Sequence, residues 1–339
     1  MDGTTSCPGP RVLIVKLSSL GDLFHALPAV HNLQRGLGAE VHWVAHWEYA
    51  DLVRCFTDVS RVIPFPRRSF LFGAWSFFRE LRRVRYEYLV DLQGLLKSAL
   101  VLWLARGRRR IGPSFHREGT RVLYPEVAGR RRRGRHAVEE NLDVIRCLRL
   151  ERVPPAFPVV FPRRAVAAPR PRVALIPFSR WPSKNWPVEH FVRLGAQLAA
   201  ARAAVFILGG PADVRACAEL AAAIGPGAES AAGGLTLVET GGLIQAMDLV
   251  IANDSGPVHM AVAVGTPTLA LFGPTDPART GPYGPGHRVL QSHVPCQPCF
   301  SRNCRLKGSG VPCLAQLPPD TVAQAALEML AAAPRATGA

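Results

Sequence analysis

Short, continuous apolar runs recur along the chain, and each is followed by a stretch in which apolar residues return at helical spacing. Unbroken runs of this kind are typical of parallel strands that are covered on both faces. In the first half, the expected strands are residues 11–18, 41–46, 61–66 and 88–92, and the expected helices are residues 23–35, 48–55, 74–85, 94–106 and 136–150. Strands that alternate with helices in this way predict a doubly wound parallel sheet.

A second alternating series follows a proline-rich segment. Its expected strands are residues 172–178, 204–208, 249–252 and 268–272, and its expected helices are residues 188–201, 212–223, 237–247, 258–264 and 319–333. A chain of 339 residues is long enough to bury two cores. We therefore expect two Rossmann-like domains facing a cleft. The predicted parts are an N-terminal domain (1–153), a linker (154–171), a C-terminal domain (172–318) and a C-terminal helix and tail (319–339).

Positive charge dominates the composition, with a formal net charge of +16 that comes almost entirely from arginine. Arginine binds phosphate and carboxylate groups through a planar fork, so nucleic acid, anionic lipid and a phosphorylated substrate are candidate partners. A GC-rich genome is an alternative source of the same excess. Two clusters stand out, at residues 108–110 and 130–135. The second has the composition of a loop, which either contacts phosphates or is simply solvated.

The start of the chain lacks the basic and apolar segments of a signal peptide, and no apolar run has the length of a membrane span. We therefore expect a cytoplasmic protein.

The most informative stretch is residues 249–276, LVIANDSGPVHMAVAVGTPTLALFGPTD. Two loops, residues 254–256 and 273–276, leave the carboxyl ends of neighbouring expected strands, where open α/β sheets bind ligands. The unpaired N–H groups at a helix start favour an anion. Asp254 is expected to accept from sugar hydroxyls or to fix the loop, and Ser255 to cap the helix. The alternative is that Asp254 and Ser255 only cap a helix and that His259 is a packed core histidine.

Other strand ends also carry polar residues. The loop SSLGD (18–22) ends in Asp22, which either caps the next helix or acts as a general base. Gln93 and Lys97, four residues apart, can share one helical face. In the loop SRWPSKNWP (179–187), Lys184 is a candidate clamp for a diphosphate. Asp213 is expected to cap a helix or, alternatively, to accept from a ribose hydroxyl.

Four of the eight cysteines, Cys296, Cys299, Cys304 and Cys313, follow the pattern C-x2-C-x4-C-x8-C. Four thiolates at such spacing can hold zinc or an iron–sulfur cluster, although the spacing is not that of a standard zinc finger. Free thiols or a redox-labile pair are the alternatives.

Four ordered blocks, KLSSLGDLFHALPAV, VDLQGLLKSA, SRWPSKNWP and NDSGPVHMAVAVGTPTLALFGPTDP, resemble glycosyltransferase family 9, the lipopolysaccharide heptosyltransferases. DLQGLLKSA followed by RRIGPSFHREG is most similar to the heptosyltransferase I group. The resemblance implies the GT-B fold, with two Rossmann-like domains and the active site between them. It also implies inverting, metal-independent transfer of L-glycero-D-manno-heptose from ADP-heptose to the Kdo of lipid A, with no cofactor required for catalysis.

The resemblance also implies roles for individual residues. Asp22 matches the catalytic aspartate, and Lys184 matches the lysine that binds the donor phosphates. The remaining implied donor contacts are Ser179, Arg180, Asp213, Asp254, Ser255, Gly256, His259, Gly273 and Thr275. The implied acceptor contacts are Ser18, Ser19, Gly21, Gln93 and Lys97. Arg180 departs from the hydroxyl residue that is usual in the family, and Asp213 is a loose match. The cysteine-rich segment lies outside the core of the family pattern.

The implied partners are ADP-heptose, Kdo-bearing lipid A and the anionic inner face of the inner membrane, without nucleic acid. Three alternatives stay open: a heptosyltransferase II-like enzyme with another acceptor, a non-catalytic basic binder of nucleic acid or membrane, and a nicotinamide enzyme. The last lacks its glycine fingerprint after the first expected strand.

Overall fold

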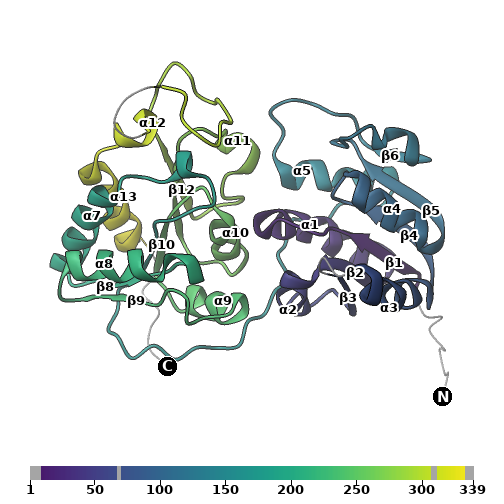
Figure 1. Ribbon diagram of the computed structural model, residues 1–339, viewed down its shortest axis with the longest axis horizontal. Helices are drawn as coiled ribbons and strands as arrows, with labels where there is room; N and C mark the ends of the chain where they lie inside the picture. The colour runs from purple at the N-terminus through teal and green to yellow at the C-terminus, as the bar shows by residue number, and fades with distance from the viewer. Residues whose placement is uncertain (1–8, 67–69, 307–310, 333–339) are drawn as a thin grey trace. The chain divides into compact units, whose positions relative to one another are not determined.

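A computed structural model describes residues 9–66, 70–306 and 311–332 of the chain. It forms two compact units, Met1–Val160 and Phe161–Ala339, and the boundary falls inside the proline-rich segment. Figure 1 shows a twisted sheet with flanking helices in each unit, the first coloured purple to teal and the second green to yellow. Among the described residues, none of the helices combines the length and the apolar character needed to traverse a bilayer.

The first unit holds a six-stranded parallel sheet in the order β3-β2-β1-β4-β5-β6. Its strands are β1 (Arg11–Val15), β2 (Glu40–His46), β3 (Arg61–Phe65), β4 (Arg85–Asp91), β5 (Arg106–Pro113) and β6 (Glu126–Ala128). Its helices are α1 (Leu20–Leu37), α2 (Ala50–Arg54), α3 (Phe70–Arg82), α4 (Leu96–Leu104), α5 (Ala137–Asn141) and α6 (Asp143–Cys147), with 3-10 turns η1 (Trp47–Tyr49) and η2 (Thr120–Leu123).

The second unit repeats this plan with the order β12-β11-β10-β7-β8-β9, again parallel throughout. Its strands are β7 (Arg172–Ile176), β8 (Ala204–Ile207), β9 (Ala228–Ser230), β10 (Leu249–Asn253), β11 (Thr268–Phe272) and β12 (His287–Gln291). Its helices are α7 (Val188–Ala200), α8 (Val214–Ile224), α9 (Leu237–Gln245), α10 (Gly256–Ala263), α11 (Pro277–Thr280), α12 (Pro312–Ala315) and α13 (Pro319–Ala332), with 3-10 turns η3 (Pro182–Lys184) and η4 (Pro211–Asp213). The predicted pair of doubly wound parallel sheets is confirmed.

The apolar runs that predicted the central strands are the cores of the two sheets. Every residue of β10 and of β11 is buried. In the first unit, Val12 to Val15 of β1 are fully buried. Strands with both faces covered by helices must be apolar along their whole length, which is why these strands were visible in the sequence.

Four strands, β5, β6, β9 and β12, were not predicted. They lie at or next to a sheet edge, and β6 and β9 have only three residues each. The arginine cluster at residues 108–110 belongs to β5, where Arg108 pairs with Glu87 at 2.9 Å and Arg109 with Glu126 at 2.6 Å. These two side chains are therefore neutralised by carboxylates on the strands that neighbour β5.

The predicted linker is fixed to the two units rather than loose. Its first part lies on the first unit, where Val160 N donates to Cys55 O at 2.9 Å. Its second part belongs to the second unit, where the ring of Phe161 is buried so closely against Gly241 that a Cβ there would approach it to 2.6 Å. Each end of the segment is thus held by the unit that it joins.

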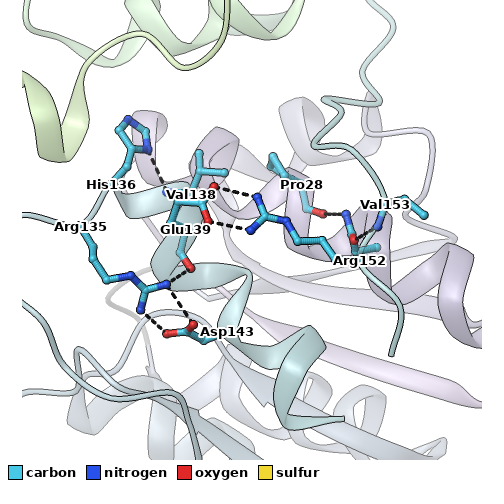
Figure 2. A network of polar contacts seen from close by, with 9 residues as sticks. Pro28, Arg135, His136, Val138, Glu139, Asp143, Arg152 and Val153 are labelled. Atoms are coloured by element: carbon cyan, nitrogen blue, oxygen red, sulfur yellow. Dashed lines mark hydrogen bonds and ion pairs between the residues drawn. The ribbon is translucent and has the colours of Figure 1, made fainter. Parts of the chain in front are cut away.

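The arginine loop at residues 130–135 is a loop, as predicted, but its last residue is structural. Arg135 forms a two-pronged ion pair with Asp143 of α6, and Arg152 pairs in the same way with Glu139 of α5 (Figure 2). Residues 130–134 are exposed. Only that exposed part remains available to an anionic partner.

The strand order places a switch point in each sheet. In the first unit, β1 lies between β2 and β4, so the chain leaves β1 and β4 toward opposite sides. In the second unit, β7 and β10 have the same relation. Open parallel sheets bind ligands beyond the carboxyl ends of such strand pairs. The loops that follow these four strands are those singled out in the sequence.

Candidate active site

The loop after β1 is closed by Asp22 in the first turn of α1. Its Oδ2 accepts hydrogen bonds from the backbone N of Ser19 at 2.9 Å and from the Ser19 hydroxyl at 2.8 Å. Asp22 therefore performs the capping role that the sequence allowed. The Asp22 side chain is partly exposed, so this carboxylate, held in one orientation, also has access to solvent.

Gln93 positions this same loop from the neighbouring strand end. Its Oε1 accepts from the backbone N of Leu17 and of Ser18, both at 3.2 Å. Gln93 precedes α4, so the prediction that it shares a helical face with Lys97 was wrong. Lys97 is exposed, and its Nζ lies 4.5 Å from the centroid of the Phe65 ring.

Two buried charged residues, neither of them predicted as a site residue, lie beneath these loops. Lys16 Nζ donates to Leu92 O at 2.6 Å. Burial lowers the pKa of Lys16, while the charges of Asp22 and Asp91 act in the opposite direction. Burial raises the pKa of Asp91, and hydrogen bonds from Tyr124 and two backbone amides oppose that shift. The only sign of their importance in the sequence is that Lys16 and Asp91 each stand at the end of an apolar run.

In the second unit, three predicted residues from three loops meet at one oxygen. Asp254 Oδ2 lies 2.6 Å from Lys184 Nζ and accepts from the Thr275 hydroxyl at 2.6 Å. Asp254 is 5% exposed, so its charge depends on these partners. The loops after β7, β10 and β11 are thereby tied together, which is the loop-fixing role considered for Asp254.

The start of α10 differs from the sequence prediction in one respect. Ser255 stands at the N-cap position but makes no side-chain cap bond. The second helical residue, Pro257, has no N–H, and the next amide, Val258 N, already donates to Ser255 O. The Ser255 hydroxyl therefore has no backbone N–H to accept from in the first turn. The buried Ser255 hydroxyl has no hydrogen-bond partner in the structure. His259, one turn along α10, is 6% exposed.

The loop after β7 is organised by Asn185 and by an asparagine that the sequence did not reveal as important. Asn185 Oδ1 accepts from both the backbone N and the hydroxyl of Ser179 at 2.9 Å. Asn253, fully buried at the end of β10, accepts from Trp186 N and donates to Pro177 O. Arg180 is exposed beside this loop.

Asp213 and Gly273 have structural roles. Asp213 Oδ2 accepts from Gly210 N at 2.9 Å and so caps η4, which was the expected alternative to a ribose contact. A Cβ at Gly273 would lie 2.8 Å from Leu314, so the close packing of α12 requires a glycine there. A cavity of about 410 Å³ lies beside the same loop and is lined by Thr275, Gln291 and Gln297, among others.

The four clustered cysteines all line a second, smaller cavity. Among the described residues, no three Cys, His, Asp or Glu side chains already stand in the arrangement of a closed metal site. Burial raises the pKa of the Cys313 thiol to about 11, and Cys296, Cys299 and Cys304 add to the rise.

Two parallel six-stranded sheets with polar strand-end loops define a glycosyltransferase of the GT-B fold. The structure is similar to "E. coli heptosyltransferase WaaC with ADP", with a TM-score of 0.77, 25% identity and coverage of 94% of this chain and 99% of the other. The model of "Glycosyltransferase family 9 (heptosyltransferase)" matches residues 74–309, and the chain belongs to that family.

Curated relatives agree with this assignment. The chain is 30% identical over 324 residues, 87% of each chain, to "Lipopolysaccharide heptosyltransferase 1" of Pseudomonas aeruginosa. It is 28% identical to the protein of the same name from Escherichia coli K12, over 83% of this chain and 93% of the relative. "Lipopolysaccharide heptosyltransferase 2" of the same strain matches over only 38% of either chain. The predicted resemblance to the heptosyltransferase I group is confirmed.

Replacing Gln93 with alanine should loosen the loop after β1 without disturbing the sheet. Two backbone amides would lose their acceptor, which typically costs about 1–3 kcal/mol for buried groups. We expect hydrogen exchange at the amides of Leu17 and Ser18 to accelerate at least about tenfold, measured by mass spectrometry or NMR. Lys97→Ala is the control, because the Lys97 amine lies over the Phe65 ring and the amides of Leu17 and Ser18 are bonded to Gln93. Equal protection in Gln93→Ala and wild type would contradict this role.

Proposed function

We propose that this glycosyltransferase moves L-glycero-D-manno-heptose from ADP-heptose to the Kdo of lipid A, in the biosynthesis of the lipopolysaccharide core. The observation that carries the proposal is the cluster of Lys184, Asp254 and Thr275 beside the start of α10. One solved structure of the similar E. coli heptosyltransferase WaaC is described as being with ADP, and a second as being with ADP-2-deoxy-2-fluoro heptose. The names of the curated relatives supply lipopolysaccharide as the acceptor.

The second unit has the chemistry needed to hold a nucleotide diphosphate. The start of α10 offers partial positive charge and the Ser255 hydroxyl, and Lys184 adds a full charge. Without donor, Asp254 neutralises Lys184. A diphosphate would share the lysine with Asp254, and Thr275 would keep the carboxylate in place. The departing ADP gains negative charge, which Lys184 and the helix start stabilise without a metal in this proposal.

The first unit supplies the base. In the proposed step, the acceptor hydroxyl oxygen bonds to the anomeric carbon while the bond from that carbon to the phosphate oxygen breaks. ADP leaves with the electron pair, Asp22 takes the hydroxyl proton, and the configuration inverts. The hydrogen bonds from Ser19 fix the Asp22 carboxylate, and Gln93 holds the loop that carries Ser18 and Ser19. Gly21 is buried in the first turn of α1.

A heptosyltransferase II-like enzyme with another acceptor is the main alternative. Kdo carboxylates and lipid A phosphates are anionic and would suit the exposed Lys97 and the exposed part of the arginine loop. Assay of ADP release with Kdo-bearing lipid A and with heptosylated lipid A as acceptors separates the two enzymes.

The structure also offers a surface for the anionic membrane that holds such an acceptor. Leu96, Leu100 and Trp103 are 46%, 49% and 46% exposed and recur on one face of α4. Arg110 lies over the Trp103 ring at 4.8 Å, and Lys97 is exposed on the same helix. An apolar stripe with a cationic rim suits the interface of an anionic bilayer. We propose that the protein works as a peripheral protein on the cytoplasmic face of the inner membrane.

Asp22→Asn should abolish turnover while donor binding survives. Asparagine can still accept from Ser19 as a cap but cannot take the proton. A loss of about 10²- to 10⁴-fold in the rate of ADP release is expected, with an ADP dissociation constant within about twofold of wild type. Asp51→Asn, at an exposed ion pair on α2, is the control. Normal turnover of Asp22→Asn would rule out the base assignment.

Lys184→Gln should weaken donor binding. The amide can still donate to Asp254, which limits structural damage, but the positive charge is lost. Charged hydrogen bonds contribute about 1.5–3 kcal/mol, so the dissociation constant for ADP should rise about 10- to 150-fold in calorimetry. Lys97→Gln removes a lysine of the first unit and should leave ADP affinity unchanged. Wild-type ADP affinity in Lys184→Gln would contradict the assignment.

Replacing both Leu96 and Leu100 with glutamine should reduce membrane binding. Removing two half-exposed leucines costs about 2 kcal/mol of apolar transfer, or about 30-fold in affinity for phosphatidylglycerol vesicles in a sedimentation assay. Val188→Gln with Val214→Gln removes a similar exposed apolar area from the second unit and should have no effect. Equal vesicle binding by the two double variants would contradict the proposed surface.

A further inference from the structure

Residues from the described parts of the cysteine-rich segment, 296–306 and 311–313, line a small cavity in the second unit. All four cysteines of the segment line it, together with residues such as Ser183, Pro274 and Leu306. The cavity measures about 20 Å³, which is room for one water molecule or a single ion. Cys296 and Cys299 are exposed, Cys304 is half-buried and Cys313 is buried.

We propose that Cys296, Cys299, Cys304 and Cys313 bind one thiolate-preferring metal ion, zinc or iron, and that this ion braces the donor-site loops. No histidine or carboxylate lines the cavity, so the donor set consists of sulfur alone. Four thiolates select zinc or iron over hard ions such as magnesium and calcium. The ion has a structural role, and no step of sugar transfer passes through it.

Binding requires the site to close. The four cysteines line the same cavity, but among the described residues no three of them are placed to hold a metal ion as they stand. A divalent ion would draw the sulfur atoms together, and each of the four thiols would release its proton to solvent. Coupling of metal binding to local ordering and to proton release is usual for cysteine sites.

The segment is bonded to two of the three loops that carry the donor-site residues, those after β7 and β11. Ser183, which precedes Lys184, donates from its hydroxyl to Ser301 O at 2.6 Å and from its backbone N to Arg302 O at 3.3 Å. Arg302 lies 5.3 Å from the centroid of the Trp181 ring, and Lys184 lies 4.8 Å from the same centroid.

On the other loop, Phe300 N donates to Pro274 O at 2.8 Å, and Gln297 Nε2 donates to Gly273 O at 2.7 Å. These two carbonyls directly precede Thr275. An ion that fixes Cys296, Cys299 and Cys304 therefore restrains the backbone beside both Lys184 and Thr275. The bracing role depends on the proposed function, whereas the presence of the ion does not.

The test is elemental analysis of the full-length protein, purified without a histidine tag and without chelator. We expect about one zinc or iron ion per chain, and the element found distinguishes the two metals. Cys296→Ser with Cys299→Ser removes two exposed ligands and should lower the metal content below about 0.1 per chain. Cys299→His should retain the ion, because imidazole is also a zinc ligand. Cys55→Ser with Cys147→Ser, at thiols of the first unit, is the matched control.

ADP affinity gives the second readout. Loss of the ion should raise the ADP dissociation constant at least about threefold while thermal unfolding still shows a folded protein. The site is refuted if the wild type contains less than about 0.1 metal ion per chain and takes up none when Zn²⁺ or Fe²⁺ is added anaerobically. It is also refuted if the double serine variant keeps its metal. Unchanged ADP affinity after metal loss refutes the bracing role. A metal-loaded chain that binds no ADP would instead refute the proposed function.

Discussion

The buried charge of Asp254 is the interaction on which the second unit's site depends. A carboxylate that is 5% exposed must be paired, and its partners come from two other loops. Losing one partner of a buried pair usually costs about 3–5 kcal/mol. Lys184 and Thr275 are therefore held in place before any donor arrives. In the proposed function, a diphosphate would meet a lysine that is already in position, rather than one that must first be ordered.

The first unit also contains a buried carboxylate, and different groups satisfy it. Asp91 is completely buried at the end of β4 and is satisfied by the Tyr124 hydroxyl and by the amides of Gln93 and Gly94. That anchoring fixes Gln93, which in turn accepts from the loop that leads to Asp22. Lys16 also belongs to this network, because its Nζ donates to Leu92 O. A chain of buried polar contacts thus leads from the interior of the sheet to the proposed base.

The sequence could predict the sheets because their central strands are apolar on both faces, as β10 and β11 show. It missed β5 because three consecutive arginines hide the pattern, and their carboxylate partners Glu87 and Glu126 lie on other strands. Lys184, Asp254 and Thr275, which the structure brings together, could be singled out because each follows an apolar strand. The contacts of Gln93 span about 75 positions of the chain, so local spacing had no means of revealing them. The expectation that Ser255 caps α10 was wrong, because Pro257 in the first turn has no N–H for the Ser255 hydroxyl to accept.

The arginine excess separates into two populations once the ion pairs are known. Arg108, Arg109, Arg135 and Arg152 are each neutralised by a carboxylate, and each of these pairs joins β5, α5 or α6 to another segment of the chain. Such arginines do not select a partner, because a ligand would have to compete with an existing ion pair. The exposed arginines at positions 130–133 differ, since binding an anion there breaks no intramolecular pair shown by the structure. Net charge therefore overstates the surface available to an anionic acceptor or bilayer, and position within the fold decides which charges act on it.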